Sequence, residues 1–302
     1  MATPLIEAIQ TAHPEAQVQL LTTPAFAPIF RAWQKLHVHA FPRRGWRTMI
    51  DIIGFVRRGN FDRIYDLQGN DRTGVICALS GVAERVGNHT RFPYTHHPSD
   101  KWRGNMHIFE RMKRVLQSAD VAVERQTPIL PTTTDERQNV ENWLATHNSE
   151  QHKLVGFHAS ASAGRAEKCW PYFVSLAKRL LTQGINPVWL GAGEDEKQNT
   201  DFIRRSGGIN ASGAFSIPEL ALCGEHFSFA VTNDSGPMHV LAASGIPVYG
   251  LFGPSDWRRN HALGQERHVI KCPDGSAKLE ELSVEEVWQR LIADQRVSSD
   301  RR

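Results

Sequence analysis

Polar and charged residues follow the ends of three predicted strands in the C-terminal half of the chain. The first group, Asn233-Asp234-Ser235-Gly236, joins an apolar strand (227–234) to a helix (236–245). In parallel α/β sheets, ligands bind beyond the carboxyl ends of the strands, and the free N–H groups at a helix start suit a diphosphate. Asp234 is suited to accept hydrogen bonds from sugar hydroxyls. The same residues also fit a plain N-cap with a tight turn, so this pattern alone leaves both interpretations open.

His239 and a second loop extend this group. His239 lies one turn into the helix, within reach of the same anion, although such a histidine could instead face the core. The loop Gly253-Pro254-Ser255-Asp256 follows the next strand (247–253) and would border the same crevice. This half of the chain therefore offers more than one loop to a single ligand.

Two further loops carry complementary chemistry. After the strand at 153–160 come the hydroxyl residues Ser160 and Ser162 and then Lys168, just before a helix. A lysine there is a point charge well placed for a phosphate, but a solvated lysine leading a helix is equally common. After the strand at 186–193, Glu194 could hold a ribose diol, or could be only a first-turn glutamate favoured by the helix dipole. Together the three loops predict a site for a nucleotide diphosphate linked to a sugar.

Alternating strands and helices must position these loops. We predict helices over 3–12, 24–33, 48–58, 72–81, 107–119, 171–184, 195–205, 236–245 and 283–295, and strands over 17–23, 35–41, 61–68, 83–88, 153–160, 186–193, 227–234 and 247–253. Residues 120–133 contain two prolines and a threonine run, which are typical of a linker. Repeated βα units on both sides predict an α/β fold class with parallel sheets and two doubly wound domains. The predicted division is an N-terminal domain over 1–125, a linker and connecting helix over 126–150, and a C-terminal domain over 151–302.

Composition and charge fit a folded protein with an anionic partner. The 302 residues are 40% hydrophobic and 22% charged, which can support two domains with cores. Residues 31–114 hold 16 Lys/Arg and 7 Asp/Glu, and Arg43, Arg44 and Arg47 cluster in one short segment. This basic half suits a phosphorylated lipid, a membrane surface or nucleic acid, or is simply an unevenly charged solvated surface. No recognition motif supports nucleic acid.

Several protein classes are disfavoured by what the sequence lacks. It contains no GxGxxG fingerprint, no GxxxxGK[ST] loop and no GxSxG elbow, which argues against nicotinamide dehydrogenases, P-loop ATPases and serine hydrolases. No apolar run is long enough to predict a transmembrane helix, and no secretory signal is visible. The four cysteines are widely spaced, so we expect reduced thiols, no metal site and a cytosolic protein.

Several segments carry a specific resemblance. NDSGPMHVLAASGIPVYGLFGPSD resembles the signature of the ADP-heptose:lipopolysaccharide heptosyltransferases, glycosyltransferase family 9. The run Lys168-Cys-Trp-Pro resembles the phosphate-binding lysine of that family. FDRIYDLQGNDRTGVICALSG with ERVG, and ATPLIEAIQTAHPEAQVQLLT, resemble its N-terminal domain. The resemblance covers nearly the whole chain.

This resemblance implies two Rossmann-like domains facing across a cleft, the GT-B arrangement. The donor, ADP-heptose, would bind the C-terminal domain, and a phosphorylated sugar on lipid A would approach the N-terminal domain. The implied reaction is an inverting displacement without metal or cofactor, in the cytoplasm or peripherally on the inner membrane of a Gram-negative bacterium. Lysine and helix N-termini would neutralise the leaving diphosphate. The implied donor site comprises Ser160 and Lys168 at the phosphates, Glu194 at the ribose, Asp234 at the transferred sugar, and Ser235, Gly236, Met238 and His239 along the diphosphate; Arg43, Arg44 and Arg47 would contact acceptor phosphates.

The front of the chain departs from the family pattern. The family opens on a strand and a Gly-Asp turn whose aspartate is the expected general base, whereas this sequence opens in the helix that follows them. We therefore expect an N-terminal domain without its first strand, and no residue here matches the base. Three hypotheses result: transfer of heptose to the lipopolysaccharide inner core, a catalytically silent nucleotide-sugar-binding protein, or a related transferase that uses another nucleotide sugar.

Overall fold

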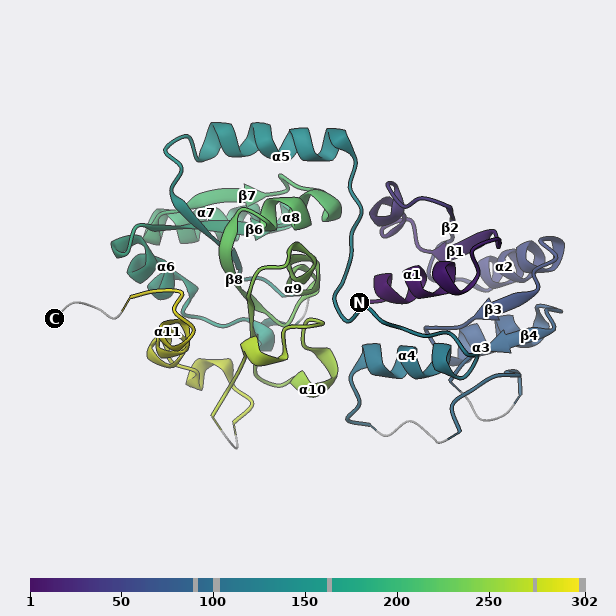
Figure 1. Ribbon diagram of the computed structural model, residues 1–302. Coiled ribbons are helices and arrows are strands. Elements are labelled where there is room, and N and C mark those ends of the chain that lie inside the picture. Colours follow the sequence, from purple (N-terminus) through teal and green to yellow (C-terminus); the bar gives the residue numbers. More distant parts are fainter. Residues whose placement is uncertain (89–91, 100–103, 162–164, 274–275, 299–302) are drawn as a thin grey trace. The chain divides into compact units, whose positions relative to one another are not determined.

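The computed structural model describes residues 1–88, 92–99, 104–161, 165–273 and 276–298. The chain forms two compact units, Met1–Pro131 and Thr132–Arg302, each built from strands and helices (Figure 1). The division falls within the segment that contains the two prolines and the threonine run. All pairings between the described strands are parallel, as expected for repeated βα units.

The N-terminal unit follows the predicted order of elements closely. Its described elements are α1 (Thr3–Ala12), β1 (Val18–Thr22), the 3₁₀ turn η1 (Ala27–Phe30), β2 (Leu36–Ala40), α2 (Trp46–Arg58), β3 (Arg63–Tyr65), α3 (Asp71–Leu79), β4 (Glu84–Val86) and α4 (Ile108–Gln117). The predicted helix over 24–33 is wrong, because only the four residues of η1 are helical. Pro24 and Pro28 cannot donate backbone hydrogen bonds there, which limits the segment to a short turn.

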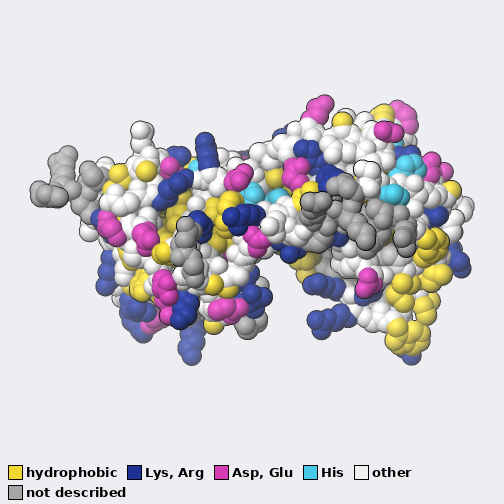
Figure 2. All heavy atoms as spheres, turned by 90° about the horizontal axis from the view of Figure 1, so that it is seen from below, with side chains coloured by type: hydrophobic (Ala, Val, Ile, Leu, Met, Phe, Trp, Pro, Cys, Tyr) yellow, Lys and Arg dark blue, Asp and Glu magenta, His cyan; other side chains and the backbone are white. Residues whose placement is uncertain are grey.

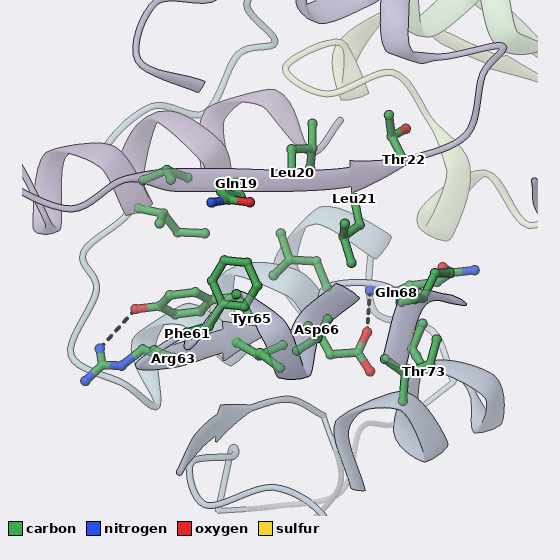
Figure 3. A pocket seen from close by; sticks show the side chains of 18 of the residues that line it. Gln19, Leu20, Leu21, Thr22, Phe61, Arg63, Tyr65, Asp66, Gln68 and Thr73 are labelled. Carbon is green, nitrogen blue, oxygen red and sulfur yellow. Dashed lines mark hydrogen bonds between the residues drawn. The ribbon is translucent and has the colours of Figure 1, made fainter. Parts of the chain in front are cut away.

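Two separate pairs of strands make up the sheet of this unit. Within the described residues, β1 pairs with β2 and β3 pairs with β4, but β1 and β3 are not hydrogen-bonded to each other. A cavity of about 1110 Å³ is lined by residues of both β1 and β3. Figure 3 shows Leu21 reaching from β1 into this space, above Asp66. The two pairs of strands thus lie on either side of a cavity rather than in one continuous sheet.

The C-terminal unit contains one continuous sheet. Its described elements are α5 (Thr134–His147), β5 (Lys153–His158), η2 (Ala166–Lys168), α6 (Phe173–Thr182), β6 (Ile185–Gly191), η3 (Gly193–Asp195), α7 (Glu196–Ser206), β7 (Ile209–Ser212), α8 (Ile217–Gly224), β8 (Phe227–Asn233), α9 (Gly236–Leu241), η4 (Ala242–Ser244), β9 (Val248–Phe252), α10 (Trp257–Asn260), η5 (Glu266–His268), β10 (Val269–Lys271), η6 (Leu279–Glu281) and α11 (Val284–Ala293). The strand order is β10-β9-β8-β5-β6-β7. The short elements β7, α8 and β10 were not predicted. Of these, β7 and β10 are the edge strands, whose pairing depends on a neighbour rather than on their own pattern.

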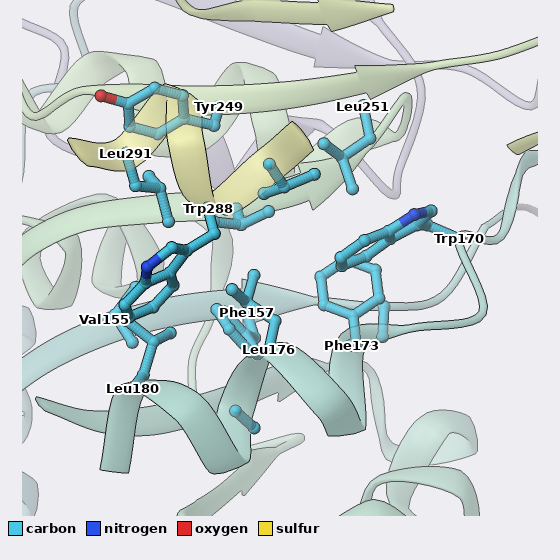
Figure 4. Close-up of a cluster of buried hydrophobic side chains, with 14 of the residues drawn as sticks. Val155, Phe157, Trp170, Phe173, Leu176, Leu180, Tyr249, Leu251, Trp288 and Leu291 are labelled. Atoms are coloured by element: carbon cyan, nitrogen blue, oxygen red, sulfur yellow. The ribbon is translucent and has the colours of Figure 1, made fainter. Parts of the chain in front are cut away.

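Both faces of this sheet are covered, and alternate residues along each strand pack into two different hydrophobic clusters. Along β5, Leu154 packs in one cluster, while Val155 and Phe157 pack in the other. Figure 4 shows the second cluster, in which Trp288 of α11 and Phe173 of α6 lie against the strands. The near-continuous apolar runs in the sequence follow from burial on two sides. This rigid sheet holds the loops at its carboxyl edge.

Candidate functional site

The carboxyl ends of β5 and β8 lie side by side at the centre of the C-terminal sheet. Strand order runs outward from β5 in one direction and from β8 in the other, so the chain reverses its direction of winding between them. His158 at the end of β5 pairs in register with Thr232 of β8. In doubly wound folds, the crevice outside such a reversal is where ligands bind. The loops that carry Lys168 and Asp234 follow these two strands and therefore meet there, while the Glu194 loop follows the neighbouring strand β6.

Lys168 and Asp234 form an ion pair at this point. The Lys168 Nζ lies 2.6 Å from the Asp234 Oδ2, and the two side chains keep only 17% and 9% of their exposure. Lys168 ends the turn η2, and Asp234 directly follows β8. The fold therefore joins a cation suited to phosphate with an acceptor suited to sugar hydroxyls. A diphosphate that binds Lys168 would compete with an existing contact.

Ser235 stands at the N-cap of α9, but its side chain does not cap the helix. Its Oγ lies 2.9 Å from the Nδ1 of His158 and 3.2 Å from the carbonyl oxygen of Asn233, to which it donates. Burial lowers the pKa of His158 to about 4, although the charge of Asp195 acts in the opposite direction, so the ring is neutral at pH 7. When the His158 ring is protonated on Nδ1, it donates a hydrogen bond to the Ser235 Oγ. The Ser235 hydroxyl then donates its own hydrogen to another acceptor. The capping interpretation of Ser235 is therefore wrong for its side chain.

Asn233 fixes the loops around this pair. Its side chain is fully buried, and its Nδ2 donates to the carbonyl oxygen of Ala159 at 2.7 Å, while its Oδ1 accepts from the backbone N–H of Trp170 at 3.1 Å. Trp170 is anchored in turn, because its Nε1 donates to the carbonyl oxygen of Leu282 at 2.7 Å. One amide thus holds the segments on both sides of Lys168. A buried amide with partners at both ends sets their positions strongly.

His158 and Asn233 had no predicted role. His158 reads as the last residue of an apolar strand, and Asn233 as the first residue of a turn. A polar residue at the end of a buried strand is the sequence signal that could have identified His158. Its partner, Ser235, lies 77 residues away in the sequence. Only the pairing of β5 with β8 shows that the two residues frame one site.

Ser160 and Glu194 are each linked to Gln198 of α7. The Ser160 Oγ donates to the Oε1 of Gln198 at 3.3 Å, and Gln198 lines a shallow hollow together with Glu194. Glu194 is exposed within η3, whereas the neighbouring Asp195 accepts from the backbone N–H of Ala192 at 2.8 Å. Glu194 therefore keeps its carboxylate toward solvent. The predicted Ser162 lies outside the described residues.

Three residues of α9 take different positions. Gly236 is exposed, and a Cβ built on it would meet nothing within 4 Å, so the space beside it is open to a ligand. Met238 is only 1% exposed and packs in the core with Leu222 and Val248, so its side chain faces away from solvent and only its backbone could meet a donor. His239 is half-buried. The helix thus presents its first residues, not Met238, to the crevice.

The basic cluster belongs to the N-terminal unit. Arg43, Arg44 and Arg47 are exposed at the start of α2, and Arg43 also lines the cavity between β1 and β3. Arg72 of α3 donates to the carbonyl oxygen of Arg43 and ties this segment to the next helix. The cluster therefore lies on an ordered helix start.

Similar proteins support the fold of both units. Over 97% of this chain and 92% of the other, the structure resembles a glycosyl transferase family 9 protein from Veillonella parvula, with a TM-score of 0.82 and 21% identity. It also resembles the Escherichia coli heptosyltransferase WaaC solved with ADP, with a TM-score of 0.75 and 18% identity over 97% and 95% of the two chains. In sequence, the chain is 22% identical to lipopolysaccharide heptosyltransferase 2 of Escherichia coli K12, over 97% of this chain and 90% of that protein.

The family model gives the assignment. The model described as glycosyltransferase family 9 (heptosyltransferase) matches residues 50–289, which cover the crevice residues from Ser160 to His239 and much of the N-terminal unit. Most of the chain therefore carries the pattern of one family, in agreement with a fold of two Rossmann-like units. This chain belongs to glycosyltransferase family 9, the heptosyltransferases.

Proposed function

We propose that this chain transfers a heptose from ADP-heptose to the inner core of lipopolysaccharide, by a displacement that inverts the anomeric carbon. The observation that carries the proposal is the Lys168–Asp234 pair at the reversal between β5 and β8. Related structures solved with ADP and with ADP-2-deoxy-2-fluoro heptose support this class of donor. A relative named lipopolysaccharide heptosyltransferase 2 supports this class of acceptor.

Each loop has a proposed role at the donor. Lys168 and the start of α9 neutralise the leaving diphosphate, with the Ser235 hydroxyl as a donor to a phosphate oxygen. Asp234 accepts from hydroxyls of the transferred heptose, and Glu194 binds the ribose. We propose that neither metal nor cofactor takes part, since the lysine and the helix start supply the positive charge. Chelation with EDTA should then leave the transfer rate unchanged, and a rate restored only by added Mg²⁺ would refute this part.

The acceptor is proposed to be an anionic glycolipid, held partly by Arg43, Arg44 and Arg47. Arginine pairs well with phosphate because its planar guanidinium offers two parallel donors. No helix among the described residues combines the length and apolar character needed to cross a bilayer. We propose a cytoplasmic site of action, peripheral to the inner membrane, with no nucleic-acid partner.

Calorimetry with ADP and ADP-heptose, paired with transfer to a lipid A–core acceptor, tests the proposal. Lys168→Ala should weaken ADP binding about 10- to 100-fold, because a charged hydrogen bond to the diphosphate is lost. Lys178→Ala, on the exposed side of α6, is the matched control and should bind ADP normally. ADP-heptose binding without transfer would support the hypothesis of a catalytically silent nucleotide-sugar-binding protein. Tighter binding of another nucleotide sugar would indicate the related transferase.

A further inference from the structure

Exposed apolar side chains gather on the N-terminal unit. Every large hydrophobic side chain that is exposed within the described residues belongs to Met1–Pro131: Leu21, Phe26, Trp46, Ile50, Val75, Leu79 and Phe92. Trp46 is 67% exposed and Ile50 is 55% exposed. Figure 2 shows apolar side chains bordered by Lys and Arg side chains at the lower right, over the N-terminal unit. Such gathering marks an interaction surface more often than chance exposure.

Four of these side chains form a strip across two neighbouring helices. Trp46 and Ile50 lie one turn apart on α2, and Val75 and Leu79 lie one turn apart on α3, so each pair shares one helical face. Arg57 shares the face of Trp46 and Ile50, and its Nε donates to the carbonyl oxygen of Leu79 at 2.9 Å. The exposed face of α2 is therefore turned toward the end of α3. We name the four side chains and the arginines around them the α2–α3 face.

In the part of the chain that the structure describes, the arginines of this face have no acidic partners. Residues 43–58 and 71–79 contain six arginines and two aspartates. None of these arginines forms an ion pair with a carboxylate among the described residues. The Arg47 guanidinium lies 5.4 Å from the centre of the Trp46 ring, so charge and apolar surface are directly adjacent. We call the six arginines of this face its basic rim: Arg43, Arg44, Arg47, Arg57, Arg58 and Arg72.

We propose that the α2–α3 face docks on the surface of a bilayer that contains anionic lipids. An exposed tryptophan at the headgroup level, short apolar insertion and a basic rim are the chemistry of interfacial helices. Anionic lipid headgroups complement the uncompensated arginines. Four side chains fall well short of the roughly 800 Å² per partner that a stable protein interface buries, which disfavours a second copy of this chain. The inference deepens the proposed function, since a lipid-linked acceptor lies in such a surface.

Flotation of the full chain with vesicles tests this face directly. We expect binding to vesicles of phosphatidylcholine mixed with phosphatidylglycerol, weak binding to phosphatidylcholine alone, and release by salt. Trp46→Gln with Ile50→Gln should weaken the partition about tenfold, because the inserted apolar area is lost. Arg57→Gln with Arg58→Gln should weaken it at least about tenfold on the anionic vesicles only.

Two matched controls separate the face from general surface chemistry. Phe26→Gln removes an exposed aromatic side chain of the same unit outside the α2–α3 face, and Arg204→Gln with Arg205→Gln removes an adjacent arginine pair from α7. Both should bind vesicles like the wild type. Absence of wild-type binding, or equal losses in the controls, would overturn the proposal. Transfer to an acceptor dispersed in detergent reports the proposed function separately, and Trp46→Gln with Ile50→Gln should retain it.

Discussion

The two units are built from the same βα pattern, but their strands are joined into sheets to different extents. As far as the structure describes it, the C-terminal unit has six parallel strands in one sheet, with buried clusters on both faces. The described residues of the N-terminal unit form two parallel pairs of strands, with a cavity of about 1110 Å³ between β1 and β3. A two-stranded ladder gains little by itself and needs neighbours for stability. We therefore expect the C-terminal unit to hold most of the cooperative stability, and its sheet to be the frame of the donor site.

The largest expected effect contrasts one core side chain from each unit. Trp288 is fully buried beside Arg179, whose guanidinium lies 4.2 Å from the ring centre, so Trp288→Ala should cost about 3–5 kcal/mol of unfolding free energy. Leu21 is 40% exposed and lines the cavity, so Leu21→Ala should cost about 1 kcal/mol or less. Urea dependence of amide exchange, read separately in peptides of β5 and β1, measures both. Equal losses would contradict the contrast between the units.

The second prediction concerns pH and the buried histidine of the complete sheet. The pKa of His158 is about 4 in the folded chain and about 6.5 when unfolded, so the unfolded state binds more protons between these values. The stability that neutral His158 contributes to the C-terminal unit should be present above pH 6.5 and should fall by about 3 kcal/mol as the pH approaches 4. Amide exchange of β5 and β8 across this range measures the slope. His158→Asn, which stays neutral and can still donate to Ser235, should remove about half of the slope, because burial also lowers the pKa of His268 in the same unit to about 4. An unchanged slope would assign the effect to other groups.

The third prediction contrasts an ion pair from each unit. Asp234→Asn keeps the shape of the side chain but releases Lys168, so ADP should bind as well as in the wild type or better, while transfer of heptose should fall about tenfold or more. Glu84→Gln breaks the Arg63–Glu84 pair between β4 and β3 and should leave ADP affinity unchanged. Calorimetry and transfer rates measure both variants. If Asp234→Asn lost ADP affinity as well as transfer, the proposed role of Asp234 at the sugar could not be separated from a role at the phosphates.

The smallest expected effect comes from filling the cavity between β1 and β3 in the N-terminal unit. A designed apolar strand, joined ahead of Met1 by a short turn, should reach the cavity because Ala2 lines it and α1 begins at Thr3. Pairing with β1 and β3 should slow their amide exchange by about tenfold, roughly 1 kcal/mol of local stability. A Gly/Ser extension of the same length is the control. Equal exchange in the two fusions would show that the cavity does not accept a strand.

Much of the local structure could be predicted because its signals are local. The predicted helix over 283–295 is confirmed as α11, which begins with a capping box between Ser283 and Glu286, and the apolar runs at β5 and β8 are strands. The edge strands β7 and β10 could not be predicted, since their pairing depends on neighbours that the linear pattern does not identify. The helix α8 was missed although Ser216 and Glu219 form a capping box at its start, which is a local signal. Free cysteines were also expected, and all four are free, with burial raising the pKa of Cys77 and Cys223 to about 12.

The sequence by itself determined the βα alternation, the loops with anion-binding character and the family signature from Asn233 to Asp256. Its residue types restrict the chemistry because lysine, serine and a free helix start suit a diphosphate whatever the fold around them. Only the tertiary structure decided that Lys168 meets Asp234, that Ser235 meets His158 instead of capping α9, and that Met238 belongs to the core. These contacts join residues far apart in the chain, and the strand order that brings them together is a property of the whole sheet.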